Sequence, residues 1–453
     1  MTMESTRLPR GTAWLLFAIG TSTTAWATDL DLAAALRIAD EKAFANRMAR
    51  DRESAASGQD LAAWAGFVPT ARLEIGASIT DDPLGAFATR LGQRRVSMAS
   101  FDPRALNDPD PVPGFTTSLV AEVPLVNLDA WHGKLAAKRN LEAMGRGTEL
   151  ERNRTRAQVV EAWFAVGLAR AAMGAWETGL AVARSYESQA ASGRRNETAT
   201  RSDVLRSKVE VASIGASLAK ARTDVQLAEK RLALLLGGGP LPGAVPAIEL
   251  SDSVLMAGVR TEAVRGTSLE SEMAGLQARA ARADWCRKRD AFLPRLNGMA
   301  RVDWKERASM LREDPSWSVG VVASWNILGG PQAFGSEREA RGRWREAETG
   351  LEALRARQAM EREVERARLA AALERLGIER GSLEQAAESH RIVGRRYEEG
   401  LATIAERIEA GSLETRIRLE MVSLRQEIVA TLSRLAILEG RDPSELASLN
   451  AKN

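Results

Sequence analysis

The chain has 453 residues, of which 45% are hydrophobic, 27% are charged and only 5% are aromatic. This composition excludes an intrinsically disordered chain, and so low an aromatic fraction is unusual for the core of a large globular enzyme. The net charge is only +3, and basic residues alternate with acidic ones along helical stretches instead of clustering. We therefore expect no nucleic-acid partner.

The chain begins with a pattern typical of an export signal. Arg7 and Arg10 precede a mostly apolar stretch, and Ala25-Trp26-Ala27 is a small-x-small cleavage site. The apolar stretch is too short to span a membrane, so we expect residues 1–27 to be a signal peptide. No later run reaches the ~18 apolar residues of a spanning helix, so the mature protein is expected to have none.

The remainder repeats one order of sequence patterns. Residues 64–69 and 289–294 each carry a helical pattern into Phe-x-Pro, where the proline ends the helix and a strand pattern begins. Residues 120–127 and 322–329 each end a strand pattern and open a long helix. The chain is therefore expected to contain two structural repeats.

A glycine- and proline-rich stretch that begins at Gly237-Gly238-Gly239-Pro240 marks the join between these repeats. We assign residues 28–245 to the first repeat, residues 246–445 to the second repeat, and residues 446–453 to a C-terminal tail. Each repeat is expected to place two short helices end to end beside one long helix, with two strands at one end.

Four segments alternate apolar and polar residues with period two, as strands do. Each has about the 9–11 residues that a tilted strand needs to cross a bilayer. Trp304, Trp317 and Trp325 lie near strand ends, where interface aromatics belong. An ordinary soluble sheet with one wet face is the alternative interpretation. The segments are residues 72–80, 115–123, 296–304 and 317–325.

The loop between the first two strands, residues 81–114, is rich in Pro and Asp. That composition predicts an exposed excursion of the chain.

Long helical patterns fill the rest of the chain. Two stretches of roughly 60 residues without proline would each extend ~95 Å as helices, and they cover residues 129–192 and 335–397. Apolar residues at three-four spacing predict coiled-coil-like seams, as at Leu369, Leu373, Leu376 and Leu383. The shorter helices are expected at residues 32–66, 202–236, 268–292 and 405–438.

Such elements require an assembly. Helical hairpins of this length have no globular body to pack against, so they need neighbours to bury their seams. A sheet that spans lipid must close on itself, and bacterial barrels begin at about 8 strands. Four strands cannot close alone, so two or more chains must contribute to a shared barrel on a shared helical tube. Such an object is a conduit.

These features resemble the TolC-like outer membrane efflux protein family. The resemblance covers nearly all of residues 28–440 and is strongest at residues 397–410, which are similar to the family's second helix–helix turn at the periplasmic tip. It implies a mainly α fold with a long periplasmic tunnel and a membrane β-barrel of 12 strands, four from each chain of a homotrimer.

The resemblance also implies a function. The protein would be a passive exit duct in the outer membrane, with its helical part in the periplasm and its barrel surrounded by outer-membrane lipid. It would dock to a periplasmic adaptor and an inner-membrane pump. It would have neither enzymatic activity nor a cofactor.

An acidic pair at the tip is implied to ring the aperture. Glu406 and Glu409 occupy the family's acidic positions and, at i and i+3, share one helix face. Repeated around a symmetry axis they would form a ring of like charge that favours cations. A solvated helix face is the alternative interpretation.

Further tip positions match the family's lock and docking turns. Asp203 and Tyr397 match two partners of the polar lock between helix pairs, while Ala402 stands where the family has an arginine. The turn positions that receive the adaptor are matched by Gly193, Gly400 and Leu401.

Catalysis finds little support in the residues. His132 and His390 are the only histidines, and no H-E-x-x-H, C-x-x-C, G-x-S-x-G or P-loop motif occurs. A single cysteine, Cys286, cannot form an internal disulfide. We expect no enzyme and no metal site. The competing class is an exported periplasmic coiled-coil adaptor or scaffold without a pore, which would not require four strands of bilayer length.

Overall fold

The computed structural model describes residues 29–247, 267–307, 314–327 and 329–449. The expected signal peptide, residues 1–27, lies outside the described residues, as does the end of the expected C-terminal tail.

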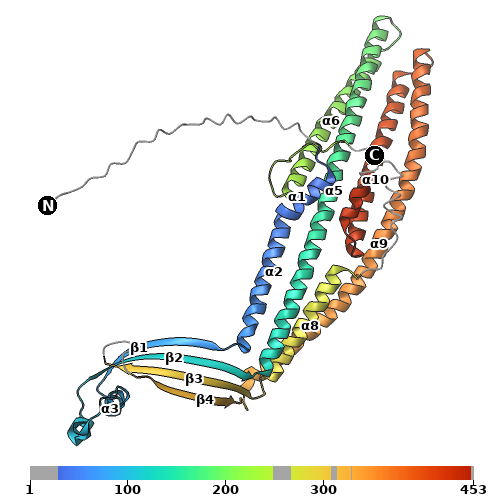
Figure 1. Ribbon diagram of the computed structural model, residues 1–453. Helices are drawn as coiled ribbons and strands as arrows, with labels where there is room; N and C mark the ends of the chain where they lie inside the picture. The colour runs from blue at the N-terminus through green and yellow to red at the C-terminus, as the bar shows by residue number, and fades with distance from the viewer. Residues whose placement is uncertain (1–28, 248–266, 308–313, 328, 450–453) are drawn as a thin grey trace, which may run out of the picture.

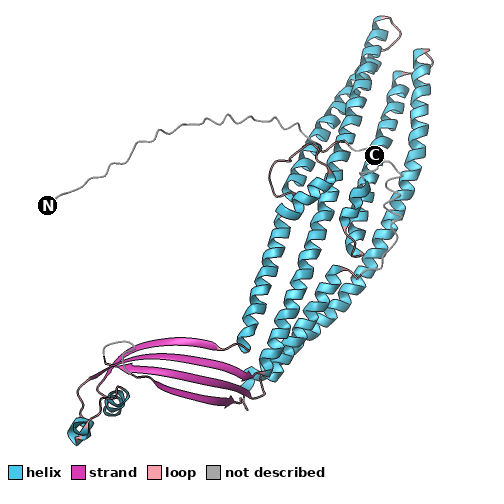
Figure 2. Ribbon diagram, in the orientation of Figure 1, coloured by secondary structure: helices cyan, strands magenta, loops and turns pink. Residues whose placement is uncertain are grey.

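Long helices with a four-stranded sheet at one end make up the molecule (Figures 1 and 2). The first half contains α1 (Leu32–Lys42), α2 (Phe44–Ala62), η1 (Ala63–Gly66), β1 (Thr70–Thr80), β2 (Val112–Val126), α5 (Leu128–Arg195) and α6 (Arg201–Leu235). The second half contains α8 (Leu269–Asp290), β3 (Arg295–Glu306), β4 (Ser316–Ser324), α9 (Gly330–Glu398), α10 (Ile404–Leu438) and η3 (Pro443–Leu449).

The two long helices form as the sequence predicts. Helix α5 has 68 residues and α9 has 69, so each extends roughly 100 Å at 1.5 Å per residue. Helix α9 begins five residues earlier than predicted, because a proline is compatible with the first turn of a helix. None of the helices in the described ranges combines the length and the apolar composition that crossing a membrane requires.

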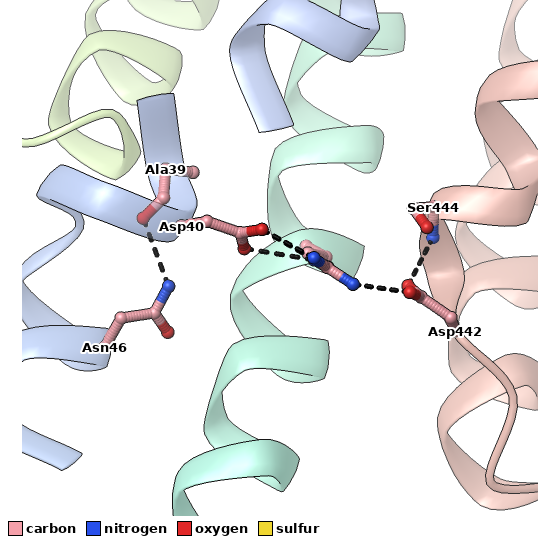
Figure 3. Close-up of polar contacts among 6 residues, drawn as sticks. Ala39, Asp40, Asn46, Asp442 and Ser444 are labelled. Carbon is pink, nitrogen blue, oxygen red and sulfur yellow. Dashed lines mark hydrogen bonds and ion pairs between the residues drawn. The ribbon is translucent and has the colours of Figure 1, made fainter. Parts of the chain in front are cut away.

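One predicted helix is broken. The pattern over residues 32–66 gives α1, α2 and the short η1 instead of a continuous helix, because the backbone of Ala43 is extended, with ψ of 132°. The side chain of Asn46 stabilises the break: its Nδ2 donates to the carbonyl of Ala39 at 3.1 Å, as Figure 3 shows.

The short helices meet along each long one. A Cβ built at Gly237, just after α6, would lie 3.0 Å from the carbonyl oxygen of Lys42 at the end of α1. A Cβ at Gly440, just after α10, would lie equally close to the carbonyl oxygen of Thr267 before α8. The short helices of both halves therefore approach each other end to end, as expected.

The main hydrophobic core lies where α1, α5, α9 and α10 converge. Trp163 and Phe164 of α5 are fully buried there, with their rings 5.1 Å apart in an edge-to-face arrangement. The predicted seam of α9 is confirmed, since Leu369 and Leu376 are buried in this core and Leu373 packs against it.

An ion-pair network ties three elements beside this core. The guanidinium of Arg156 on α5 binds Asp40 of α1, with Nη2 to Oδ2 at 2.5 Å, and on its other side it binds Asp442 before η3 (Figure 3). The hydrogen bond to Asp40 is the largest influence that raises the pKa of Arg156. The network therefore holds the beginning and the end of the described chain against the first long helix.

The sheet is antiparallel with strand order β1-β2-β3-β4. Strand β2 pairs with β3 as well as with β1, so the hairpins of the two halves join into one sheet. Among the described residues, the outer edges of β1 and β4 have no strand partner.

One face of this sheet is apolar and the other is polar. Residues opposite each other in the register point to the same side, so the alternation in each strand adds up across all four. The apolar face carries Leu73, Ile75 and Ile79 of β1, Leu119 of β2, Val302 and Trp304 of β3, and Trp317, Val319 and Val321 of β4.

The polar face holds a hydrogen-bonded network. Ser118 of β2 donates to Asp303 of β3 at 2.5 Å, and Arg301 contacts both residues at 2.8 Å. Arg72 of β1 lies 3.8 Å from Glu122 of β2 on the same face. The two faces therefore differ in chemistry over the full width of the sheet.

The exposed excursion predicted over residues 81–114 is not a simple loop, because it contains three short helical elements. The segment contains α3 (Pro83–Gly92), η2 (Met98–Phe101) and α4 (Pro103–Asn107). Helices α3 and α4 begin at Asp-Pro pairs: Asp82 accepts from the amide of Gly85 at 2.6 Å, and Asp102 accepts from Arg104 at 3.0 Å. An aspartate N-cap followed by proline is a helix start, so the Pro and Asp content signalled helices.

Candidate functional site

Two helix–helix turns form the end of the molecule far from the sheet (Figure 1). In the α5–α6 turn the amide of Thr198 donates to the carbonyl of Gly193 at 2.8 Å. In the α9–α10 turn the amide of Leu401 donates to the carbonyl of Arg396 at 2.7 Å. In each turn a second backbone hydrogen bond is nested within the first. This pair of bonds is the Schellman pattern of a helix end.

This pattern places one residue of each turn in the left-handed conformation. Gly400 has φ of +74°, and Glu197 has φ of +59°. Glu197 is therefore the counterpart of Gly400, whereas Gly193 still lies in the last turn of α5. The stretch from Gly193 to Asp203 is longer than that from Gly400 to Glu406 for this reason.

Both following helices begin with the same capping box. Thr200 accepts from the amide of Asp203 at 3.2 Å, and the Asp203 carboxylate accepts from the Thr200 amide at 2.8 Å. Thr403 and Glu406 repeat the arrangement at 3.2 and 2.7 Å. Hydrogen bonds from the backbone and hydroxyl of Thr403 hold the pKa of Glu406 below its ordinary value. The tip therefore carries an ionised carboxylate at this position, and Glu409 is exposed one turn further along α10.

A small apolar cluster joins the two hairpins behind the turns. Tyr186 and Ala190 of α5 are buried against Ile404 and Ile408 of α10, with Val182, Val204 and Tyr397 packed around them. No sequence pattern predicted this cluster. Its only local signal is that the chain has just two tyrosines, and both of them lie here.

Arg407 sits between those two tyrosines. Its guanidinium lies 4.8 Å from the ring centre of Tyr186 and 5.2 Å from that of Tyr397, within the range of cation–π attraction. Its Nη1 also donates to Gln189 of α5 at 2.8 Å. One arginine of α10 thus binds α5 and α9. It stands five residues after Ala402, the position at which the TolC-like family has an arginine.

Tyr186 also begins a polar chain that crosses three helices. Its hydroxyl lies 2.5 Å from Nε2 of His390 on α9, and Nδ1 of His390 lies 2.7 Å from Glu414 of α10. An ionised carboxylate only accepts, so Nδ1 donates to Glu414 and a neutral ring accepts the tyrosine proton at Nε2. Arg418 completes the chain at 2.6 Å from Glu414.

The electrostatics favour an ionised Glu414 beside a neutral Tyr186. Burial raises the pKa of Tyr186. Burial also acts to raise the pKa of Glu414, but hydrogen bonds from His390 and Arg418 outweigh it and hold that pKa below its ordinary value. The chain is therefore a set of satisfied hydrogen bonds between the hairpins. Among the described residues, no group of three His, Cys, Asp or Glu side chains is arranged to hold a metal ion.

The two residues expected to form the lock lie near each other. Burial raises the pKa of Tyr397, and the negative charge of Asp203 acts in the same direction, while Arg407 opposes it. The carboxylate of Asp203 is also engaged in the cap of its own helix.

A cavity of about 700 Å³ adjoins the Tyr186–His390–Glu414 chain on the side toward the core. Helices α5, α6, α9 and α10 all line it, with residues such as Trp176, Glu210 and Leu419. The four helices therefore leave an open space directly behind the contacts that join the hairpins near the tip.

The fold built from these parts is that of solved outer-membrane channel proteins. The chain is similar to the outer membrane protein VceC of Vibrio cholerae (TM-score 0.76, 17% identity, covering 91% of this chain and 96% of that one). It is also similar to the CmeC outer membrane channel of Campylobacter jejuni (TM-score 0.76, 12% identity, 99% and 97% covered). The MtrE outer membrane channel of Neisseria gonorrhoeae is a third such structure (TM-score 0.73, 16% identity, 91% and 89% covered).

These similarities confirm, at the level of the fold, the resemblance to TolC-like channels that the sequence predicts. No protein-family model matches the sequence, and no curated protein matches it.

Proposed function

We propose that this protein is the subunit of an outer-membrane duct, a passive exit conduit of an efflux or secretion system. The observation that carries the proposal is the two-faced sheet with open edges. Its apolar face extends over all four strands, and its polar face holds the Ser118–Arg301–Asp303 network. Apolar-out and polar-in alternation is the pattern of a membrane barrel around an aqueous lumen.

Aromatic residues support the membrane placement. Trp317 is the second residue of β4, and Trp325 follows its last residue. Eight residues of strand separate them by roughly 26 Å, which is similar to the ≈ 25 Å apolar band of outer-membrane barrels. Trp64 and Trp131, which each pack edge-to-face on Phe67 at the base of the sheet, fit the inner belt.

Closure of the sheet then requires further copies of the chain. In lipid the open edges of β1 and β4 would leave backbone groups unpaired, so each must meet a neighbour's strand. Four strands fall short of the ~8 of the smallest barrels. The homotrimer that the resemblance implies would supply 12 strands, with outer-membrane lipid around the apolar face.

The helical part would extend into the periplasm and present its turns to the other components. We propose that Gly193, Gly400 and Leu401 receive a periplasmic adaptor, which links the duct to an inner-membrane pump. Leu401 supports this role because it is an apolar residue with 65% of its surface exposed at the outermost turn.

At the tip, Glu406 and Glu409 would surround the aperture and favour cations. Asp203 and Tyr397 would hold the tip closed, and the position of Arg407 between the two hairpins makes it a further member of this lock. His390 and Arg407 both hold the hairpins together through these contacts, so we assign them a structural role.

Conductance tests the proposal directly. The full-length protein, extracted from outer membranes in detergent, would be added to a planar lipid bilayer. Discrete, cation-selective steps are expected of a duct. A protein that fractionates as a periplasmic species and never conducts would instead be the coiled-coil scaffold considered above.

A further inference from the structure

The helical excursion between β1 and β2 lies over the polar face of the sheet. A Cβ at Gly114 would lie 3.1 Å from Thr89 of α3, and a Cβ at Gly92 of α3 would lie 2.9 Å from the side chain of Lys305. Gly114 and Lys305 alternate with Phe115 and Trp304 of the apolar face, so both point to the polar side.

The excursion is fixed at the end of the sheet farthest from the long helices (Figure 1). The buried side chain of Gln93, only 1% exposed, donates from Nε2 to the carbonyl of Pro113 at 2.8 Å and to that of Glu306 at 3.1 Å. These carbonyls belong to β2 and β3, so one side chain joins the end of α3 to two strands. Arg94 adds an ion pair to Asp314 at 3.0 Å.

The parts of the excursion also pack on each other. Phe87 of α3 and Phe101 of η2 meet edge-to-face with their ring centres 5.8 Å apart, and Ala86 is fully buried. This packing leaves one set of large apolar side chains in solvent: Leu84, Leu91, Met98 and Phe101.

We propose that these side chains meet their counterparts from other copies of the chain and close the outer mouth of the duct. The inference rests on the proposed function, in which the polar face lines a lumen. Since α3 lies on that face, the sheet separates Leu84 and Leu91 of α3 from the surrounding lipid, and η2 packs on α3 through Phe101 and Phe87. Equivalent segments arranged around the lumen axis are then the surfaces that can bury them.

The charge of the excursion agrees with self-association. Residues 81–114 contain four arginines and five aspartates, 4 − 5 = −1, at positions 90, 94, 95 and 104 and at positions 81, 82, 102, 108 and 110. Copies with so small a net charge do not repel each other strongly. A segment that bound the phosphates of lipid headgroups would be expected to be distinctly basic.

Cross-linking tests the contact. In a Cys286→Ser background, Met98→Cys would be treated in outer membranes with a short bismaleimide and run on a denaturing gel. The expected result is a shift from monomer to cross-linked dimer, and Leu84→Cys should behave alike. The control is Val319→Cys, which is similarly exposed at 73% but lies on the apolar face, and it should stay monomeric.

Conductance tests the closure. Gln93→Ala, which removes the anchor of α3, and replacement of residues 83–107 by a Gly-Ser linker should both increase single-channel conductance. Each would be measured with Arg407 intact and with Arg407→Ala, so that the tip does not limit the current.

The possible failures can be told apart. A protein that light scattering finds to be monomeric in detergent would overturn the proposed function, and the closed mouth with it. Two results with an intact oligomer would overturn only the proposed closure of the outer mouth. One is the absence of a cross-link at Met98 and at Leu84. The other is a conductance that neither Gln93→Ala nor the replacement of residues 83–107 changes.

Discussion

The hydroxyl of Tyr186 lies 2.5 Å from Nε2 of His390, although 204 positions separate the two residues in the sequence. The bond joins the first long helix to the second near the tip. Removal of either partner should loosen the two hairpins from each other.

His390→Ala should destabilise the protein more than Tyr186→Phe does. The alanine removes the histidine partner of Tyr186 and one of the two partners of Glu414, which keeps Arg418. The cost should be about 1–3 kcal/mol, whereas the phenylalanine removes one hydrogen bond of about 1 kcal/mol. Thermal unfolding followed by helical circular dichroism measures both variants. Equal stability of His390→Ala and the unchanged protein would show that the chain of hydrogen bonds contributes nothing.

Acid should weaken the same contact through Glu414. The pKa of this carboxyl is lower in the folded protein than its ordinary value, so its contribution is present at neutral pH and is lost as the pH falls through the folded pKa. Glu414→Gln should therefore be less stable than the unchanged protein near neutral pH. The difference in stability between Glu414→Gln and the unchanged protein should become smaller as the pH falls below the ordinary pKa of a glutamate. A gap independent of pH would assign the stability difference to packing instead.

Arg407 should hold the tip closed through its planar guanidinium. Arg407→Ala removes the contacts with Tyr186, Tyr397 and Gln189 and should increase single-channel conductance. The conductance of Arg407→Lys should lie between those of Arg407→Ala and the unchanged protein, because a lysine ammonium keeps the charge but lacks the planar group that stacks on the tyrosine rings. The matched control is Arg391→Ala, which removes only an exposed pair with Glu388 on the same helix and should conduct like the unchanged protein.

The two turns should respond in opposite directions to glycine. Glu197→Gly relieves a left-handed residue that carries a side chain and should stabilise the α5–α6 turn by about 1 kcal/mol. Gly400→Ala should destabilise the α9–α10 turn by a similar ~1 kcal/mol. Hydrogen exchange of the amides of Thr198 and Leu401 reports on each turn separately. A change of the same sign in both would contradict the assigned conformations.

The acidic pair can be tested apart from its role in the helix cap. Glutamine at N3 can still serve in a capping box, so Glu406→Gln combined with Glu409→Gln removes charge while it keeps the start of α10. The cation preference of the channel should fall, together with its block by multivalent cations. Unchanged reversal potentials, with the helix content preserved, would leave both residues as parts of a solvated helix face.

The periodicity of the sequence was sufficient to predict most of the secondary structure. Alternation with period two predicted all four strands, and the long stretches without proline predicted the long helices. Three-four spacing predicted the seam at Leu369 and Leu376. The helices of the excursion were not predicted, because Asp and Pro are common in loops, although an aspartate cap before a proline is also a helix start.

The sequence was sufficient to locate the tip, but not to predict which of its side chains are in contact. Residue matching aligned Gly193 with Gly400, whereas hydrogen bonding aligns Glu197 with Gly400, because a backbone requirement can be met by different residue types. The chain by itself determined its strands, helices and caps, since these depend on neighbours a few residues apart. Only the tertiary structure decided that Tyr186, His390, Arg407 and Glu414 meet, because packing of α5 against α9 and α10 brings together side chains that no local pattern relates.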